Sequence, residues 1–183
     1  MIEIKRYHPE LFETWNQFVH AAKNGLFFFN RNYLSYHEDR FKDHSLLFYK
    51  KDQLIALLPA SEKEKTISSH GGLTFGGLIM DPAIRAEEVL EIFESFKAYY
   101  KSEGFEIIIY KAIPHIFNTL PSEEDLYALF RSNAQIVTRN ISSILNLKNP
   151  IRFSETKRQN VRKCEKAEVT VQETAEWEDF WIL

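Results

Sequence analysis

The stretch from residue 65 to residue 80, KTISSHGGLTFGGLIM, constrains the fold of this chain more than any other part of the sequence. Two glycine pairs, Gly71-Gly72 and Gly76-Gly77, interrupt residues that otherwise have the composition of strands. Paired glycines in strands indicate a bulge, a positive φ, or a close approach by another backbone or a ligand. Two interpretations follow: a glycine-eased bend in a curved sheet, or a binding lip whose backbone N–H groups face a substrate.

The residues that flank the glycine pairs predict a loop histidine and a helix. His70 stands at the entrance of the stretch and is either structural or a base or ligand residue. Asp81 and Pro82 are expected to cap and open a helix that runs from about Ala86 and ends before Gly104. Its predicted buried face consists of apolar residues at helical spacing: Val89, Leu90, Phe93, Phe96 and Tyr100.

The rest of the first 150 residues predicts an α/β domain with a central mixed sheet flanked by helices. The expected sheet strands are 45–49, 54–59, 105–110 and part of 135–147, and one-faced helices are expected at 11–22 and near 122–130. The run FEIIIY at 105–110 is nearly continuous in apolar residues, which favours a strand covered on both faces. Ser122 and Asp125 form a capping-box pattern.

Charge and cysteine content exclude several classes of protein. The 183 residues carry a formal net charge of -3, so the whole chain is not a polycation for nucleic acid. Cys164 is the single cysteine, which excludes an internal disulfide and a cysteine-built metal site and favours a cytoplasmic protein. His37, Asp39 and His44 match no strong metal motif, and no metal is expected. The N-terminus lacks a signal-peptide core, and no apolar run approaches a membrane span.

Asn149-Pro150 is the clearest domain boundary, with a first domain at 1–150 and a second element at 151–183. Beyond it, FSETKRQNVRKCEK predicts a basic helix, Val169 to Val171 a strand, and residues from Ala175 an amphipathic helix. The apolar end, FWIL at 180–183, needs a cover. A second domain missing from this sequence, or self-association, would provide it.

Two polar clusters are candidate binding residues. Asn30 and Arg31 either bind an anionic acceptor or form a helix cap and a surface cation. Arg158 and Arg162 share one face of the basic helix, which is either a phosphate-contacting surface or a solvated one. Together with His70, Gly71, Gly72, Gly76 and Gly77, these residues make up the predicted substrate site. His115 lies in a proline-framed loop, and no catalytic residue can be assigned.

The order of elements is similar to a GNAT acyltransferase domain, and three stretches resemble a narrower group. RQNVRKCEKAEVTV resembles the R-R-x-x-R-K-A-x-K-x-G motif of the Fem-type peptidoglycan bridge aminoacyltransferases, which opens the second of their two GNAT-like domains. HGGLTFGGLIMDP resembles the glycine-rich strand pair of their first domain, and NGLFFFNRNYLSYHEDRF their early helix region. Cys164 and Ala167-Glu168 depart from the motif.

The resemblance implies transfer of an acyl or aminoacyl group to an amine, in the cytoplasm, for a bacterial cell wall. The donor would be acyl-CoA or aminoacyl-tRNA, bound largely by the second domain, and the acceptor an anionic or nucleotide-linked molecule. The basic helix would contact tRNA. A Q/R-x-x-G-x-G/A pyrophosphate loop does not occur in the sequence, so this segment is expected to bind no cofactor and to be inactive alone.

Two hypotheses from different classes therefore remain. One is an acyl- or aminoacyltransferase fragment whose chemistry needs a second domain. The other is a non-catalytic binding module for a phosphate- or carboxylate-bearing ligand. Continuation of the reading frame past Leu183 into another GNAT-like half would favour the enzyme.

Overall fold

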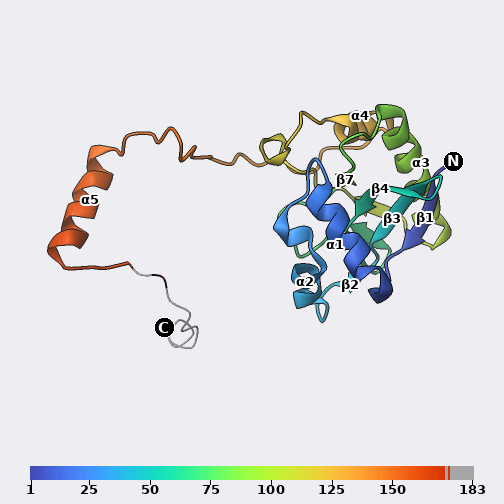
Figure 1. The fold of residues 1–183 in the computed structure, drawn as a ribbon, viewed down its shortest axis with the longest axis horizontal. Coiled ribbons are helices and arrows are strands. Elements are labelled where there is room, and N and C mark those ends of the chain that lie inside the picture. Colours follow the sequence, from blue (N-terminus) through green and yellow to red (C-terminus); the bar gives the residue numbers. More distant parts are fainter. Residues whose placement is uncertain (172, 174–183) are drawn as a thin grey trace. The chain divides into compact units, whose positions relative to one another are not determined.

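The computed structural model describes residues 1–171 and 173, with the side chain of residue 37 outside that description. The chain divides into two compact units, Met1–Gln135 and Ile136–Leu183. All strands of the described residues lie in the first unit, together with four of the α-helices (Figure 1). The helix α5 (Glu155–Lys166) belongs to the second unit. The helix expected from Ala175 and the apolar residues 180–183 lie outside the described residues.

The first sheet is antiparallel and contains the predicted hairpin. Its strand order is β1-β3-β4-β7, with β1 (Glu3–Arg6), β3 (Leu46–Lys50), β4 (Gln53–Leu58) and β7 (Ile79–Met80). Lys50 pairs with Gln53, and the two turn residues Lys51 and Asp52 have φ of 49° and 64°. This is the two-residue turn whose twist suits a hairpin.

The second sheet is mixed, and one of its strands, β6, is formed by the first residues of the glycine stretch. Its order is β2-β5-β6-β8, with β2 (Lys42–Asp43), β5 (Ser61–Lys63), β6 (Thr66–Ser68) and β8 (Ile107–Ile109). β6 pairs with β8 in parallel, and the other pairs are antiparallel. The ten residues 69–78 separate β6 from β7, so the glycine pairs lie exactly where the chain leaves one sheet for the other.

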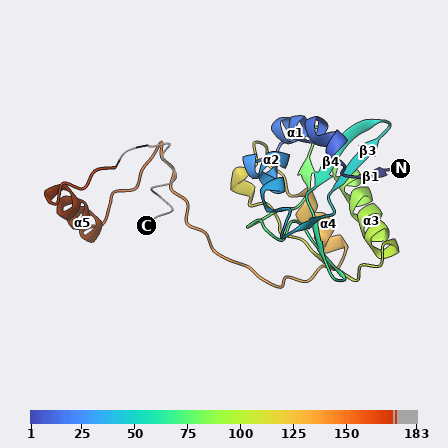
Figure 2. The ribbon, with the colours of Figure 1, turned by 90° about the horizontal axis from the view of Figure 1, so that it is seen from below.

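Helices cover both faces of the strands (Figure 2). α1 (Phe12–Ala21) and α2 (Arg31–Leu34) cover one face, where Trp15, Phe29 and Leu57 are buried. α3 (Ala86–Ser102) and α4 (Glu124–Arg131) cover the other, where Phe93 and Phe96 are buried. Short 3₁₀ turns occur at η1 (Pro9–Leu11), η2 (Phe27–Phe29), η3 (Ser35–His37) and η4 (His115–Phe117). The predicted α/β class is confirmed, but the single central sheet is wrong. β3 and β4, at the predicted strands 45–49 and 54–59, lie in the antiparallel sheet, whereas β8 lies in the mixed one.

The predicted bounds of α3 are confirmed, whereas the predicted cap at Asp81-Pro82 is wrong. The helix begins at Ala86, and the backbone N–H of Arg85 donates to the Glu88 carboxylate (2.8 Å) at its first turn. Asp81 instead accepts the N–H of Ala83 (2.8 Å) in a separate turn. Gly104 follows the helix with φ of 88°, the left-handed end that a glycine favours.

Three other expectations about secondary structure are wrong. β8 is not covered on both faces: Ile107 is 55% exposed, because in the described part of the chain β8 is an edge strand. Within the described residues 135–171, neither 135–147 nor 169–171 forms a strand. On α4, the helix expected near 122–130, the apolar side chains do not all share the buried face: Leu126 and Phe130 are exposed, and Asp125 and Ala128 are buried. None of the described helices is long and apolar enough to cross a membrane.

Candidate functional site

The second glycine pair is explained by packing of the chain on itself. A Cβ atom on Gly76 would lie 1.8 Å from the carbonyl oxygen of Ser69, and one on Gly77 would lie 2.9 Å from the hydroxyl of Tyr110. Gly77 also has φ of 79°. Both glycines are buried. Of the two interpretations of the glycine stretch, these contacts favour the structural one, a glycine-eased bend, over the binding lip.

Between the strands, the first half of the loop is held by hydrogen bonds from one side chain, that of Lys111. Lys111 Nζ donates to the carbonyl oxygens of Leu73 (2.7 Å), His70 (3.1 Å) and Gly71 (3.3 Å). Partial burial lowers the pKa of Lys111. His70 is 3% exposed, with φ of 46°, and Gly71 and Gly72 are exposed beside the ring of Phe41. The loop therefore uses its carbonyl groups internally.

Arg31 is a buried residue whose charge is paired within the protein. Its side chain is 2% exposed, its Nη1 lies 2.6 Å from Asp43 Oδ2, and its guanidinium lies between the rings of Tyr7 (3.3 Å) and Trp15 (3.7 Å). Asn30 precedes α2, but its side chain does not cap the helix. Substrate binding by Asn30 and Arg31 stays a prediction, and the enclosure of the guanidinium by aromatic rings and Asp43 does not favour it.

Arg158 and Arg162 lie on exposed positions of α5, in the second unit. Arg158 Nη2 pairs with Glu155 (2.7 Å) one turn earlier. Their proposed role in phosphate or tRNA contact stays a prediction.

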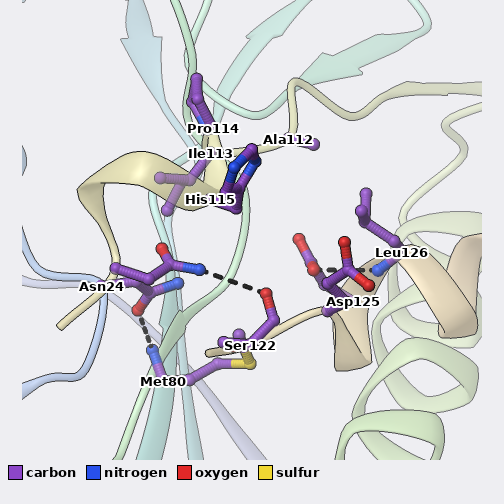
Figure 3. A pocket seen from close by; sticks show the side chains of 11 residues that line it. Asn24, Met80, Ala112, Ile113, Pro114, His115, Ser122, Asp125 and Leu126 are labelled. Atoms are coloured by element: carbon purple, nitrogen blue, oxygen red, sulfur yellow. Dashed lines mark hydrogen bonds between the residues drawn. The ribbon is translucent and has the colours of Figure 1, made fainter. Parts of the chain in front are cut away.

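A pocket of about 180 Å³ lies where β7 ends and the chain after β8 diverges from it (Figure 3). Its wall residues come from four places: the end of α1, β7, the segment around η4, and the start of α4. They are Asn24, Met80, Ala112, Ile113, Pro114, His115, Asn118, Ser122, Glu123, Asp125 and Leu126. The volume is a little above that of a cavity that holds one benzene molecule.

Asp125 is the most unusual polar group in this pocket. It is 6% exposed, and burial raises the pKa of its carboxyl group. The Tyr110 hydroxyl donates to Oδ2 (2.8 Å), and the N–H of Leu126 donates to Oδ1 (2.9 Å). Burial, followed by the charge of Asp125, raises the pKa of Tyr110 well above 10.0. Tyr110 is therefore a neutral donor, and its oxygen accepts the N–H of Leu78 (2.7 Å).

The backbone groups at the edge of β7 beside the pocket are hydrogen-bonded to Asn24 and Lys23. The Asn24 side chain donates to the carbonyl of Leu78 and accepts the N–H of Met80, both at 2.8 Å. The N–H of Lys23 donates to the Met80 carbonyl (3.0 Å). Asn24 is 2% exposed. Because the N–H groups of Leu78 and Met80 are already bonded, neither is available to stabilise an oxyanion in this conformation.

The charge of the pocket suits a cation. Glu123, Asp125 and His115 line it, and there is neither lysine nor arginine among its described wall residues. The neighbouring Glu124 is neutralised by Lys23, whose Nζ lies 2.7 Å away and whose side chain is 3% exposed. This pocket therefore does not fit the anionic acceptor expected from the sequence.

The start of α3 does not fit a pyrophosphate. The N–H groups of Arg85 and Ala83 already bond to the carboxylates of Glu88 and Asp81. Glu87 adds a further negative charge to the first turn. A helix N-terminus binds phosphate through free N–H groups and a positive dipole, and the acidic first turn offsets that dipole here.

Sequence reasoning treated Asp125 as part of a helix cap and missed its role. A signal was present: Asp125 precedes Ala128 and Leu129 by three and four residues, and so shares their helix face. No capping box forms, because Ser122 donates to Glu124 (2.7 Å) and Asp125 bonds to Tyr110. No group of three His, Cys, Asp or Glu side chains suited to a metal occurs in the described residues.

Comparisons with known proteins identify the fold. No family model matches, and no curated protein matches. Among solved structures, the aminoglycoside N-acetyltransferase AAC(6')-Iy, bound to a CoA bisubstrate analogue, is 11% identical over 80% of this chain and 99% of its own, with a TM-score of 0.52. A GNAT family acetyltransferase of Staphylococcus aureus subsp. aureus USA300_TCH1516 is 13% identical over 79% of this chain and 98% of its own, with a TM-score of 0.50. A ribosomal-protein-alanine N-acetyltransferase of Brucella melitensis biovar Abortus 2308 is 13% identical over 84% of this chain and 100% of its own, also at 0.50.

Proposed function

We propose that this chain, which has the GNAT acyltransferase fold, binds the amine acceptor of an acyl- or aminoacyl-transfer reaction in the pocket around Asp125. The observation that carries the proposal is a buried carboxylate with a raised pKa in a pocket whose described wall residues include no cation. A primary amine is an ammonium ion at neutral pH, and a carboxylate in a partly desolvated pocket attracts it strongly.

The same residues suit the proton transfer that the reaction requires. An amine attacks an acyl carbonyl only after it loses a proton; a C–N bond then forms and the C–S bond of a thioester, or the C–O bond of an ester, breaks. A carboxylate whose pKa is raised is a stronger base than an ordinary aspartate. His115 lines the pocket and is exposed, so its imidazole connects the pocket to solvent. The leaving thiolate or alkoxide takes up a proton in turn.

The donor is proposed to bind elsewhere, in agreement with the expected need for a second domain. The Fem-type resemblance supports an aminoacyl donor and a cell-wall acceptor, and it rests on three stretches of sequence alone, RQNVRKCEKAEVTV, HGGLTFGGLIMDP and NGLFFFNRNYLSYHEDRF. The comparisons do not support that narrower link. The occupied N–H groups of Leu78 and Met80 favour a second candidate function, a non-catalytic amine-binding module.

Acetyl-CoA should not bind to this chain with micromolar affinity. The reason is that the sequence contains no Q/R-x-x-G-x-G/A loop and that Glu87 and Glu88 place negative charge at the start of α3. Calorimetry with acetyl-CoA measures this directly, with a known CoA-binding acetyltransferase as the positive control. A clear micromolar isotherm would overturn the assignment of the donor to another domain.

Binding of a small alkyl amine such as n-butylamine should depend on the ionisation of Asp125. The carboxylate attracts the ammonium, so affinity should be constant near neutral pH and fall as the pH drops through the Asp125 pKa. Because burial raises that pKa, the fall should begin above the pH at which an ordinary aspartate, of pKa about 3.9, takes up its proton. Calorimetry across a pH series measures the midpoint.

Two variants separate this effect from general charge. Asp125→Asn should weaken n-butylamine binding about tenfold or more, since it removes the charge and keeps the shape. Glu87→Gln removes an exposed charge from α3, away from the pocket, and should leave affinity unchanged. The assignment would be refuted if both variants lost the same affinity for n-butylamine. It would also be refuted if the Asp125→Asn variant kept the pH dependence of binding that the parent chain shows.

A further inference from the structure

The hydroxyl group of Tyr110 joins the backbone of the glycine stretch to the carboxylate of the pocket. The N–H of Leu78 donates to the Tyr110 oxygen (2.7 Å), and the hydroxyl donates to Asp125 Oδ2 (2.8 Å). An N–H group can only donate, and a hydroxyl has a single hydrogen, so that hydrogen is directed to the carboxylate. We call these three groups, the Leu78 N–H, the Tyr110 hydroxyl and the Asp125 carboxylate, the support chain.

Gly77 leaves the space that the support chain needs. A Cβ atom at this position would lie 2.9 Å from the Tyr110 hydroxyl oxygen and 3.0 Å from the ring carbon that bears it. A side chain here would displace the hydroxyl from the Leu78 N–H. The N–H of Gly76 donates to the carbonyl of Lys111 (2.9 Å), which holds the two segments together beside Tyr110. The second glycine pair therefore serves the pocket indirectly, because it admits the tyrosine.

Several groups act on the charge of Asp125 from different elements. Burial raises the pKa of its carboxyl group, and the hydrogen bonds from Tyr110 and from the Leu126 N–H (Figure 3) lower it. The other ionisable groups around it are the pocket residues Glu123 and His115, and Glu124 with its partner Lys23. Tyr110 is thus the side chain that offsets part of the effect of burial by a direct hydrogen bond.

We propose that Tyr110 is a positioning residue, which uses the support chain to hold the carboxylate of Asp125 charged and oriented for an ammonium ion. Hydrogen bonds in a chain polarise one another, so the bond from Leu78 strengthens the donor that Asp125 receives. Each carboxylate oxygen has two lone pairs, and one protein donor on each leaves the others for a ligand. Tyr110 thereby sets the lowest pH at which the pocket still holds an amine. This consequence rests on the proposed function, whereas the support chain itself can be tested without a ligand.

The direct test is a ¹³C NMR titration of the Asp125 carboxyl group in the full chain without amine. In Tyr110→Phe the midpoint should lie about one pH unit above that of the parent, because the charged form loses a strong hydrogen bond. Tyr100→Phe is the matched control, since Tyr100 is buried and its hydroxyl donates to the His44 carbonyl (3.1 Å), outside the support chain. It should leave the midpoint unchanged. An unchanged midpoint in Tyr110→Phe, or an equal rise in Tyr100→Phe, would overturn the proposal.

The parent chain allows a second measurement, which decides the question even if Tyr110→Phe does not fold. The ring carbon that bears the Tyr110 hydroxyl and the amide of Leu78 should both shift with pH at the midpoint of Asp125, because they belong to one hydrogen-bonded chain. The corresponding ring carbon of Tyr100 should not follow that midpoint. If neither Tyr110 nor Leu78 followed Asp125, the support chain would be refuted.

Binding of n-butylamine then separates this proposal from the proposed function. Well above the midpoint, the affinity of Tyr110→Phe should stay within about threefold of the parent, because Asp125 is charged in both. At the midpoint of the parent it should be about fivefold weaker, since about a tenth of the carboxyl groups are charged instead of half. If n-butylamine does not bind to the parent, the proposed function fails, and the two NMR titrations still decide the role of Tyr110.

Discussion

Gly76→Val is expected to be the most destabilising single change discussed for this protein. The first added atom, Cβ, would lie 1.8 Å from the carbonyl oxygen of Ser69 and 2.6 Å from its carbonyl carbon. Both are backbone atoms, so no side-chain rotation can relieve the contact. The N–H of Gly76 also donates to the Lys111 carbonyl (2.9 Å), which a shift of the backbone would break. We expect a loss of about 4 kcal/mol or more, out of the roughly 5–15 kcal/mol that stabilises a typical domain.

Urea denaturation followed by circular dichroism measures this loss. Gly71→Ala is the matched control, because Gly71 is exposed and its Cβ would lie 3.1 Å from the movable Phe41 ring and the Ser61 hydroxyl. It should cost about 1.5 kcal/mol or less. A Gly76→Val protein with unchanged stability and impaired ligand binding would instead support the binding lip.

Phe93→Ala should be the second most damaging change. Phe93 is 2% exposed on the sheet-facing side of α3, with ring centroids 4.8 Å from Phe96 and 5.5 Å from Tyr110. Its removal leaves a cavity that these rings fill only in part, which costs about 3–5 kcal/mol. Because Tyr110 holds Asp125, the cavity should also weaken amine binding.

The control for Phe93→Ala is Phe130→Ala, a change of the same size at a 74% exposed position. Surface changes of this kind stay within about 0.5 kcal/mol. Thermal unfolding of the two variants beside the parent protein makes the comparison. Equal stability of Phe93→Ala and the parent would contradict the packing of α3 on the sheet.

The parts of the fold that were predictable from sequence depend on local patterns. The 3.6-residue spacing of Val89, Phe93 and Phe96 gives α3, and the polar break at Lys51 and Asp52 gives the hairpin. The errors concern pairing over long range. The run at 105–110 has the composition of a central strand, but its exposure depends on which other strand lies beside it, and no local pattern in the sequence specifies that.

The candidate site was harder to predict, because residue type says little about burial. Arg31 has the chemistry of an anion-binding residue, yet two rings and Asp43 enclose it. Asp125 has the appearance of a helix cap, yet it is held by Tyr110, 15 residues away in the sequence. Gly76 and Gly77 lack side chains because the backbone of Ser69 and the ring of Tyr110 lie close to them. A ligand-binding lip would also need residues without side chains, so the sequence alone could not decide between the bend and the lip.

The central claim is that Asp125 and its pocket bind a primary amine. The most direct measurement is an NMR titration of the parent chain and of Asp125→Asn with n-butylamine at neutral pH. In the parent chain, backbone shifts should concentrate at Asn24, Met80, His115, Asp125 and Leu126, and they should be lost in Asp125→Asn. Shifts that scatter over the surface, or that persist unchanged in Asp125→Asn, would contradict the claim.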